Sequence, residues 1–541
     1  MEMSNTTPEP LRSGTSTTSP RHVRLEIAAL LTEREEALAE GQSERGFCRG
    51  VDVPRSTLRD EVSRLQRLDM APEVVTFYSS PQGHLQLMRI VLAAHFVMTL
   101  LGCCGVASVS SFLVLAGLGP FVGTSHGAQQ EVNAWLQKRV AAFGQEEPRR
   151  LGKSMPRRTI WLCEDETFFP QMVLVAIEAL SDYVLVERPA DRRDAATWSA
   201  VVKEQLEGLP VEVVGLTADG AKGIAAHAQQ SFGVAVTPDV FHVQHDVSKV
   251  VTAPLASHVR AAEEQLQQAR QRGDDDKAAA EKWTEARVQQ QRMAAAIDGV
   301  GEACRPYDER TGERRCGGQV ASDLHEMLDE AEAVATSSGL SEASHKGIGK
   351  ARRAIDAIAA SIEGYHHHVE LCLAALHLPE EIKSAMRDQV LPALYLERIA
   401  EQSRDSESKR RLHARAKALT APLQDEATSP MMRLSEAAVA DLLRQGSLWV
   451  AQHVRASSCV EGRNGQLELH HHGLRGLSDA KLAALTVVRN FWTRRADGTT
   501  AAERFFEQQP RDLFEWLLDV LPDLPRPAQK RPRVAPSPLL N

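Results

Sequence analysis

The chain has 541 residues, which is too long for one ordinary domain and long enough for about three or four. Hydrophobic residues make up 43% of it, so real cores can form, while the low aromatic share of 5% favours helix. The formal charge of −9 argues against a protein that coats nucleic acid non-specifically, but it does not exclude a DNA enzyme with local phosphate contacts. Eight cysteines without a disulfide-like framework, and no visible secretory start, predict a reducing, cytoplasmic location.

The N-terminal part predicts a helical DNA-binding region. Residues 1–20 are rich in Ser, Thr and Pro and are expected to be a disordered leader, and residues 22–40 form a charged amphipathic helix. The following segment, SERGFCRGVDVPRSTLRDEVSRLQRL, predicts a short helix that ends at a Gly, a tight turn and a second helix. This is the pattern of a helix-turn-helix, whose second helix enters the major groove by its first residues, here Arg55, Ser56, Thr57 and Arg59. A plain helical hairpin is the alternative.

Residues 90–118 form the most apolar stretch of the chain. A membrane span needs about twenty unbroken apolar residues, and here His95, the serines at 108–111 and several glycines interrupt the run. We therefore expect two buried helices, with Cys103 and Cys104 in the core.

The pattern changes after Arg158, where strands begin. The expected strands are residues 159–163, 172–179, 183–187, 211–217 and 234–236, and the expected helices between them are 195–206 and 223–232. Three meandering strands followed by helix-linked strands predict an α/β fold with a mixed sheet. Strand signals stop at about residue 255, a charged helical hairpin breaks at Gly273–Asp276, and helices continue to about residue 450. The Pro-rich, basic residues 521–541 are expected to be a disordered tail.

Acidic residues follow two of the predicted strands. Glu164, Asp165 and Glu166 come after the first, Asp219 comes after the fourth, and a distal acid, Glu461, lies at a polar, Gly-flanked helix start. Mg²⁺ takes carboxylate oxygens, and two such ions stabilise both oxygens of an in-line phosphoryl displacement. The layout therefore suits a two-metal nuclease.

Each of these acids also has a plainer interpretation. A carboxylate that follows a buried strand is often a turn former or a helix N-cap. In the first group, period-two alternation puts Glu164 and Glu166 on one face and Asp165 on the other, so the alternation alone does not rank the three.

Four segments together resemble a known family. In chain order they read LCEDET, LTADG, PDVFH and SSCVEGRNGQLELHHHGLRGLSDAKLAALTVVRNFWTRRADGTTAAERFF, and the last is the most specific. From about residue 158 to 516 the chain resembles bacterial insertion-sequence transposases with an RNase H-like DDE catalytic core. The resemblance implies a core in two parts, residues 151–254 and 446–520, with an all-helical insertion of residues 255–445. Residues 21–150 would be the helix-turn-helix region.

The resemblance also implies the roles of particular residues. Asp165, Asp219 and Glu461 match the catalytic acids and would hold two Mg²⁺ or Mn²⁺ ions. Asp239 and His242 resemble an Asp-x-x-His element that supports the active site, and the Asn464 amide is a candidate for a supporting contact.

The implied function is that of a DNA transposase, which cleaves insertion-sequence ends and transfers strands. Its partners would be double-stranded DNA, with terminal inverted repeats and target sites, and further copies of itself in a homodimer or higher oligomer. We expect no membrane association and a cytoplasmic, nucleoid-associated location. The alternatives are a catalytically inactive or repurposed DNA-binding regulator, and an RNase H-like nuclease without strand transfer.

Overall fold

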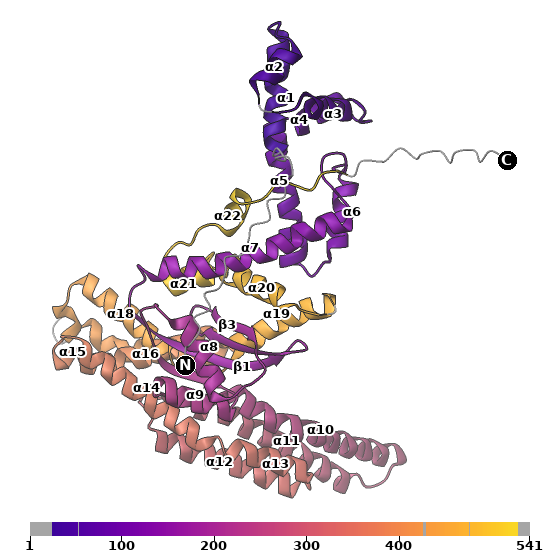
Figure 1. Cartoon of the computed structure of the whole chain (residues 1–541). Helices are drawn as coiled ribbons and strands as arrows, with labels where there is room; N and C mark the ends of the chain where they lie inside the picture. Colours follow the sequence, from indigo (N-terminus) through magenta and orange to yellow (C-terminus); the bar gives the residue numbers. More distant parts are fainter. Residues whose placement is uncertain (1–23, 52, 426–428, 475, 528–541) are drawn as a thin grey trace, which may run out of the picture. The chain divides into compact units, whose positions relative to one another are not determined.

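The computed structural model of the chain describes residues 24–51, 53–425, 429–474 and 476–527. Over these residues the fold is mostly helical, with one five-stranded sheet (Figure 1). It divides into two compact units, Met1–Arg139 with Asp512–Asn541, and Val140–Arg511. The predicted leader, residues 1–20, lies outside the described residues.

The first unit begins with the helices of the predicted helix-turn-helix. They are α1 (Arg24–Ala39), α2 (Glu44–Gly50) and α3 (Arg55–Gln66). Ser43 caps α2, because its hydroxyl accepts a hydrogen bond from Gly46 N at 3.1 Å. Leu58 of α3 is fully buried in a small core with Phe47 of α2. The predicted pair of helices is confirmed.

The apolar block that follows is also helical. Its elements are α4 (Pro72–Ser79), α5 (Pro81–His95), the π-helical turn η1 (Phe96–Leu101) and α6 (Val106–Leu115). The continuous helix Pro81–Leu101 is long and apolar enough to cross a membrane, but half of its most apolar window is buried inside the fold. Core helices of soluble proteins pass the same test, so this one weakly apolar helix is compatible with the predicted buried helix.

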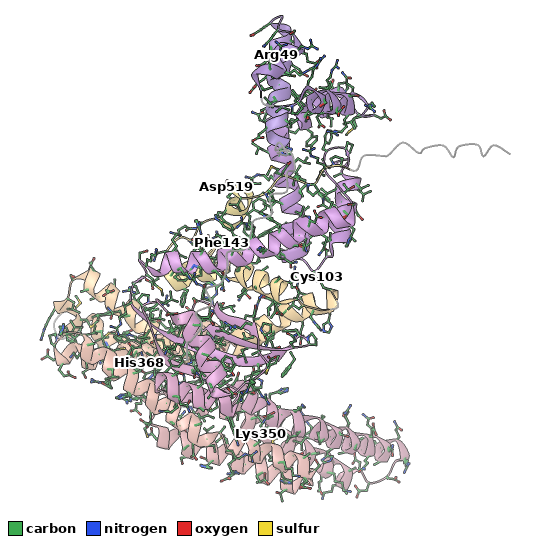
Figure 2. The ribbon with its side chains drawn as sticks, viewed as in Figure 1. Arg49, Cys103, Phe143, Lys350, His368 and Asp519 are labelled. Carbon is green, nitrogen blue, oxygen red and sulfur yellow. The ribbon has the colours of Figure 1, made fainter. Side chains whose placement is uncertain are left out.

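Two details of the prediction for this block are wrong. Val114 and Leu115 at the end of α6 are exposed, so α6 is buried along one side only. Cys103 and Cys104 are exposed as well, not buried in the core (Figure 2). The reason is local: the chain leaves helical conformation between Gly102 and Gly105, so the two thiols belong to a connecting segment and not to a buried helix face.

The end of the chain returns to the first unit. Helix α7 (His126–Gly152) contributes residues to both units, and α22 (Leu513–Asp519) belongs to the first. Residues 528–541 of the predicted disordered tail lie outside the described residues. For residues 521–527 the prediction is wrong, because Leu521 and Leu524 are buried and Pro525 accepts a backbone hydrogen bond from Gly123 at 2.7 Å.

The second unit contains the predicted mixed sheet. Its strands are β1 (Arg158–Phe168), β2 (Met172–Glu178), β3 (Tyr183–Pro189), β4 (Val211–Ala218) and β5 (Val236–Pro238), in the order β3-β2-β1-β4-β5. Short turns make β1, β2 and β3 antiparallel. Helices α8 (Ala195–Leu206) and α9 (Lys222–Phe232) precede β4 and β5, which lie parallel to their neighbours.

Strand β1 is longer than predicted, and this changes the place of its acids. The sequence put Glu164, Asp165 and Glu166 after the strand, but all three lie inside it and pair with β2, with Asp165 opposite Val175. The pairing of β1 with β4 ends earlier, at Cys163 and Thr217. The acids therefore lie where β1 extends past its parallel neighbour, and pairing with β2 keeps this extension in strand conformation.

The two faces of the sheet are covered by different helices (Figure 1). Helices α8 and α9 cover one face, with Trp198 and Ile224 buried. On the other face, α19 (Ser458–Leu474) and α20 (Asp479–Phe491) bury Val460 and Leu485 against the sheet. The short helix α21 (Ala501–Phe506) packs on β3.

Between β5 and α19 the described residues are mostly helical. The helices are α10 (Val240–Arg272), α11 (Lys277–Ala303), α12 (Gly317–Ser337), α13 (Glu342–Arg352), α14 (Ile355–Ala375), α15 (Glu380–Ala385), η2 (Met386–Val390), α16 (Leu391–Gln402), α17 (Ser406–Thr420), η3 (Ala421–Gln424), η4 (Pro430–Arg433) and α18 (Glu436–Ala451). The predicted break between α10 and α11 is confirmed, and Gly273 ends α10 with a φ of 72°. Helix α10 starts at Val240, not at residue 255, because Asp239 caps it and buried valines continue its apolar face towards the N-terminus.

A buried ion pair fixes α19 to β3. The Arg463 guanidinium donates to both carboxylate oxygens of Glu187, at 2.7 and 2.6 Å. Thr486 of α20 donates to the same carboxylate at 2.6 Å. The bidentate geometry and the additional donor compensate the cost of burying these two charges. The ion pair therefore sets the position of α19 on the sheet.

We predict that Arg463→Met destabilises the protein by about 3–5 kcal/mol, because the Glu187 carboxylate stays buried without its partner. The control is Arg188→Met on β3, next to Glu187. This variant breaks an exposed pair with Glu204 and should cost about 1 kcal/mol or less. Urea unfolding followed by circular dichroism measures both. Equal destabilisation in the two variants would contradict this account of α19.

Candidate functional site

The site is built from four segments of the second unit. Asp165 lies in β1, Asp219 directly follows β4, Asp239 and His242 lie at the start of α10, and Glu461 is in the first turn of α19. His242 is 3.2 Å from Asp239 and 3.5 Å from Glu461, and its charge environment includes Asp165. Asp165 in turn interacts electrostatically with Asp219. The structure thus brings together all three predicted catalytic acids and the predicted Asp-x-x-His pair.

The faces of β1 separate the three neighbouring acids. Cys163 packs with Val460 and Leu467 of α19, and Asp165, two residues on, lies on that same face. Glu166 lies on the opposite face, where it accepts a hydrogen bond from the indole of Trp198 at 3.3 Å. Of the three, Asp165 is therefore the acid on the side of Glu461.

Glu164 faces helix α9 and is completely buried. Its closest charged group is His227, whose Nε2 lies 3.5 Å away, and His227 Nδ1 is 2.9 Å from the Ser199 hydroxyl. Burial raises the pKa of Glu164, an effect that His227 partly opposes. No sequence pattern indicates this network, because Ser199 and His227 come from two separate helices.

Asp165 is the most perturbed acid of the site. Burial raises its pKa to about 6, and the charges of Asp219 and Glu166 act in the same direction. The Glu166 backbone N–H, which donates to Asp165 Oδ1 at 2.8 Å, and the charge of His242 oppose the shift. A carboxylate in this position is destabilised by its surroundings until a cation compensates it.

Asp219 stands at the end of β4 and is exposed. Gly220 follows with a φ of 90°, a conformation that favours glycine, and Asp219 Oδ1 accepts a hydrogen bond from Ala221 N at 3.1 Å. The exposed carboxylate remains accessible to a cation from solvent. The predicted position of this acid at a strand end is confirmed.

Asp239 is buried and has several partners. Its Oδ1 accepts from His242 N at 3.2 Å, and its Oδ2 accepts from both the N–H and the hydroxyl of Ser457, at 2.8 and 2.5 Å. Burial would raise the pKa of Asp239, but the bonds from Ser457 and His242 lower it overall. Ser457 is a functional contact that the sequence did not reveal, since it lies 218 positions from Asp239.

His242 is half-buried between two carboxylates. Burial would lower its pKa, but pairing with Asp239 and the charges of Glu461 and Asp165 raise it overall. Its Nδ1 faces Asp239 Oδ2 and its Nε2 faces Glu461 Oε1.

Glu461 and Asn464 lie one helical turn apart on α19. The Glu461 side chain is 39% exposed, which leaves it accessible to a ligand. The Asn464 Oδ1 atom is buried, and no hydrogen-bond partner for it occurs in the described part of the chain. Asn464 therefore lies next to Glu461 on the helix, and in the described residues its Oδ1 makes no hydrogen bond with the acids.

The predicted DNA-binding residues lie in the first unit, at the start of α3. Ser56 and Arg59 are exposed, and Arg55 and Thr57 are half-buried. Glu44 of α2 pairs with both Arg55, at 3.1 Å, and Arg59, at 3.2 Å. The hydrogen bond from Arg34, more than any other interaction, lowers the pKa of Glu44. Glu44 therefore stays charged and competes with phosphate for Arg55 and Arg59.

The donor set of the site fits a divalent ion. Asp165, Asp219 and Glu461 offer carboxylate oxygens, the ligands that Mg²⁺ and Mn²⁺ take. The negative charges of Asp165 and Asp219 repel each other, and a bound cation would relieve this repulsion. Asp239, His242 and Glu461 also offer ligand atoms within 4.8 Å of one another.

Comparison with known proteins gives one partial match. A family described as of unknown function, DUF6399, matches residues 386–533. This segment contains Glu461 and α19 but none of the other acids of the site. No curated protein matches the chain.

The raised pKa of Asp165 leads to a prediction about stability. The pKa of Asp165 is about 6 in the folded protein and 3.8 in its ordinary state, so the folded protein binds the proton more tightly. The contribution of this proton to stability is therefore full below pH 3.8 and disappears as pH rises through 6. In metal-free buffer, Asp165→Asn should therefore exceed wild type in unfolding free energy by about 1–3 kcal/mol above pH 6. The difference should shrink as pH falls towards 4. Chemical unfolding at several pH values with EDTA tests this, and a pH-independent difference would contradict it.

Proposed function

We propose that the protein is a DNA transposase that cleaves and joins DNA strands with an RNase H-like DDE core. The observation that carries this proposal is a series of electrostatic contacts between segments far apart in the sequence. Asp219 interacts with Asp165, Asp165 interacts with His242, and His242 lies 3.5 Å from Glu461. A separate structural role for each acid would not require these contacts.

The fold supports the same proposal. Three antiparallel strands are followed by two parallel ones, and Asp165 and Asp219 lie just past the point where β1 and β4 end their pairing with each other. Ligands of mixed α/β sheets bind at such strand ends. The helical segment 240–451 interrupts this arrangement and returns the chain to it at α19, as an insertion in an RNase H-like core would.

The chemistry follows from the donor set. Two Mg²⁺ or Mn²⁺ ions bound there would polarise the phosphate and activate the attacking oxygen, first of water and then of a DNA 3′-hydroxyl. Asp165, Asp219 and Glu461 would hold these ions, Asp165 and Asp219 from the sheet and Glu461 from α19. Asp239 would orient His242, and Asn464 would support the substrate or the acids.

The proposed partners are double-stranded DNA, at terminal inverted repeats and target sites, and further copies of the chain as a homodimer or higher oligomer. The helix α3 would read DNA through Arg55, Ser56, Thr57 and Arg59. A nucleoid-associated, cytoplasmic location belongs to the same proposal.

A second candidate is an RNase H-like nuclease without strand transfer. The pairing of Glu44 with Arg55 and Arg59 favours it, because arginines held by an acid are less available for specific base contacts. Joining of cleaved ends to a second DNA distinguishes the transposase from this nuclease.

We predict that Asp165→Asn, Asp219→Asn and Glu461→Gln each abolish DNA cleavage but not folding, because each removes the charge that holds a divalent ion. Glu164→Gln and Glu166→Gln are the matched controls and should keep most of the activity, since they lie on the other face of β1. The assay uses a plasmid that carries the genomic DNA flanking this gene, with Mg²⁺ or Mn²⁺. Full activity in any of the first three variants would remove that residue from the site.

For DNA reading, we predict that replacement of both Arg55 and Arg59 by Ala weakens binding to element ends. The expected cost is about 1–3 kcal/mol for each arginine that hydrogen-bonds to a base edge. Glu44→Gln should have the opposite effect, because it frees both arginines. The exposed Arg49 of α2 provides a control, Arg49→Ala, which should not change discrimination (Figure 2). Gel-shift titrations on end and scrambled DNA measure all three, and unchanged discrimination in the double variant would argue against a recognition helix.

A further inference from the structure

His242 lies between the carboxylates of Asp239 and Glu461. Its Nε2 lies 3.5 Å from Glu461 Oε1, and its charge environment includes Asp165. Two ligands at about 2.1 Å from one ion lie about 3.0–3.5 Å apart, depending on the coordination angle. The separation of Nε2 and Oε1 is therefore that of two atoms which can share a metal ion.

Asp239 is unsuited to bind the same ion directly, although its oxygens lie close by. Its Oδ1 accepts the His242 backbone N–H, and its Oδ2 accepts two bonds from Ser457 and faces His242 Nδ1 at 3.2 Å. A buried carboxylate 3.2 Å from Nδ1 favours a proton on that nitrogen, which leaves Nε2 with a free lone pair for a metal ion. Asp239 is therefore a positioning residue for His242.

We propose that His242 Nε2 is a ligand of the metal centre, next to Glu461, and that it makes this centre select Mn²⁺ over Mg²⁺. The inference rests on the proposed function, since it refines the metal site of that function. Imidazole nitrogen suits first-row transition ions, whereas Mg²⁺ takes oxygen ligands in a strict octahedral arrangement. A centre of carboxylates alone would discriminate less between the two ions, because carboxylate oxygens suit both Mg²⁺ and Mn²⁺.

The experiment measures metal binding by the full-length chain, independently of DNA cleavage. Calorimetric titrations with Mn²⁺ and with Mg²⁺ compare wild type with His242→Asn and His242→Gln, two variants at a partly exposed position. His245→Asn is the matched control, because His245 is exposed on the same helix and stacks on Phe241, with ring centroids 6.0 Å apart. Circular dichroism checks folding of each variant.

We expect both His242 variants to bind Mn²⁺ about tenfold or more weakly, with a much smaller change for Mg²⁺. Asp239→Asn should weaken Mn²⁺ binding in the same direction, and His245→Asn should behave as wild type. Pulsed electron paramagnetic resonance of bound Mn²⁺ should show coupling to an imidazole ¹⁴N in wild type and none in His242→Asn.

Retained Mn²⁺ affinity and retained ¹⁴N coupling in both His242 variants would overturn the inference. Equal weakening of Mn²⁺ and Mg²⁺ binding would overturn the selectivity. If Asp165→Asn and Glu461→Gln no longer bind Mn²⁺ while the His242 variants still do, this inference fails and the proposed function stands. If none of these variants changes metal binding, the metal centre of the proposed function fails as well.

Discussion

The hydrogen bonds between Asp239 and Ser457 are the contact on which the candidate site depends. They join the start of α10 to the residue that precedes α19, across the whole helical segment between them. The backbone repeats the connection, because Val240 N donates to Arg455 O at 2.9 Å, and the Thr217 hydroxyl of β4 donates to Val454 O at 2.9 Å. The long helical segment thus leaves the sheet and returns to it at one place, and Glu461 comes beside His242 as a result.

The Arg463–Glu187 pair completes this arrangement further along α19. Ser457 fixes where the helix starts, and Arg463 fixes the direction of the helix against β3. Glu461 lies between these two fixed points. Its side chain can remain partly exposed and still hold a defined position, which is what a residue that binds an ion from solvent needs.

Much of the core could be predicted from the sequence, because its signals are local. Short apolar runs indicated β2 and β3, and Asp219 followed by Gly220 indicated the end of β4. The predictions failed where a distant partner decides the conformation. Pairing with β2 carries β1 through its three acids, and capping by Asp239 starts α10 earlier than its charged region suggests.

The site shows the same division between local and distant signals. Strand ends named the candidate acids, and the family resemblance pointed to Asp165 among the three neighbours. The physical reason, that Asp165 faces α19 while Glu164 and Glu166 face the other side of β1, comes from the structure. Ser457 and the buried Glu164–His227 network could not be found from the sequence, because hydrogen bonding across helices leaves no pattern within one segment.

The central claim is that Asp165, Asp219 and Glu461 form one divalent-metal centre. Anomalous diffraction from crystals of the full-length protein soaked in Mn²⁺ tests it most directly. The account predicts an anomalous peak between these three carboxylates. An ordered site without such a peak, or Mn²⁺ bound only elsewhere on the protein, would contradict it.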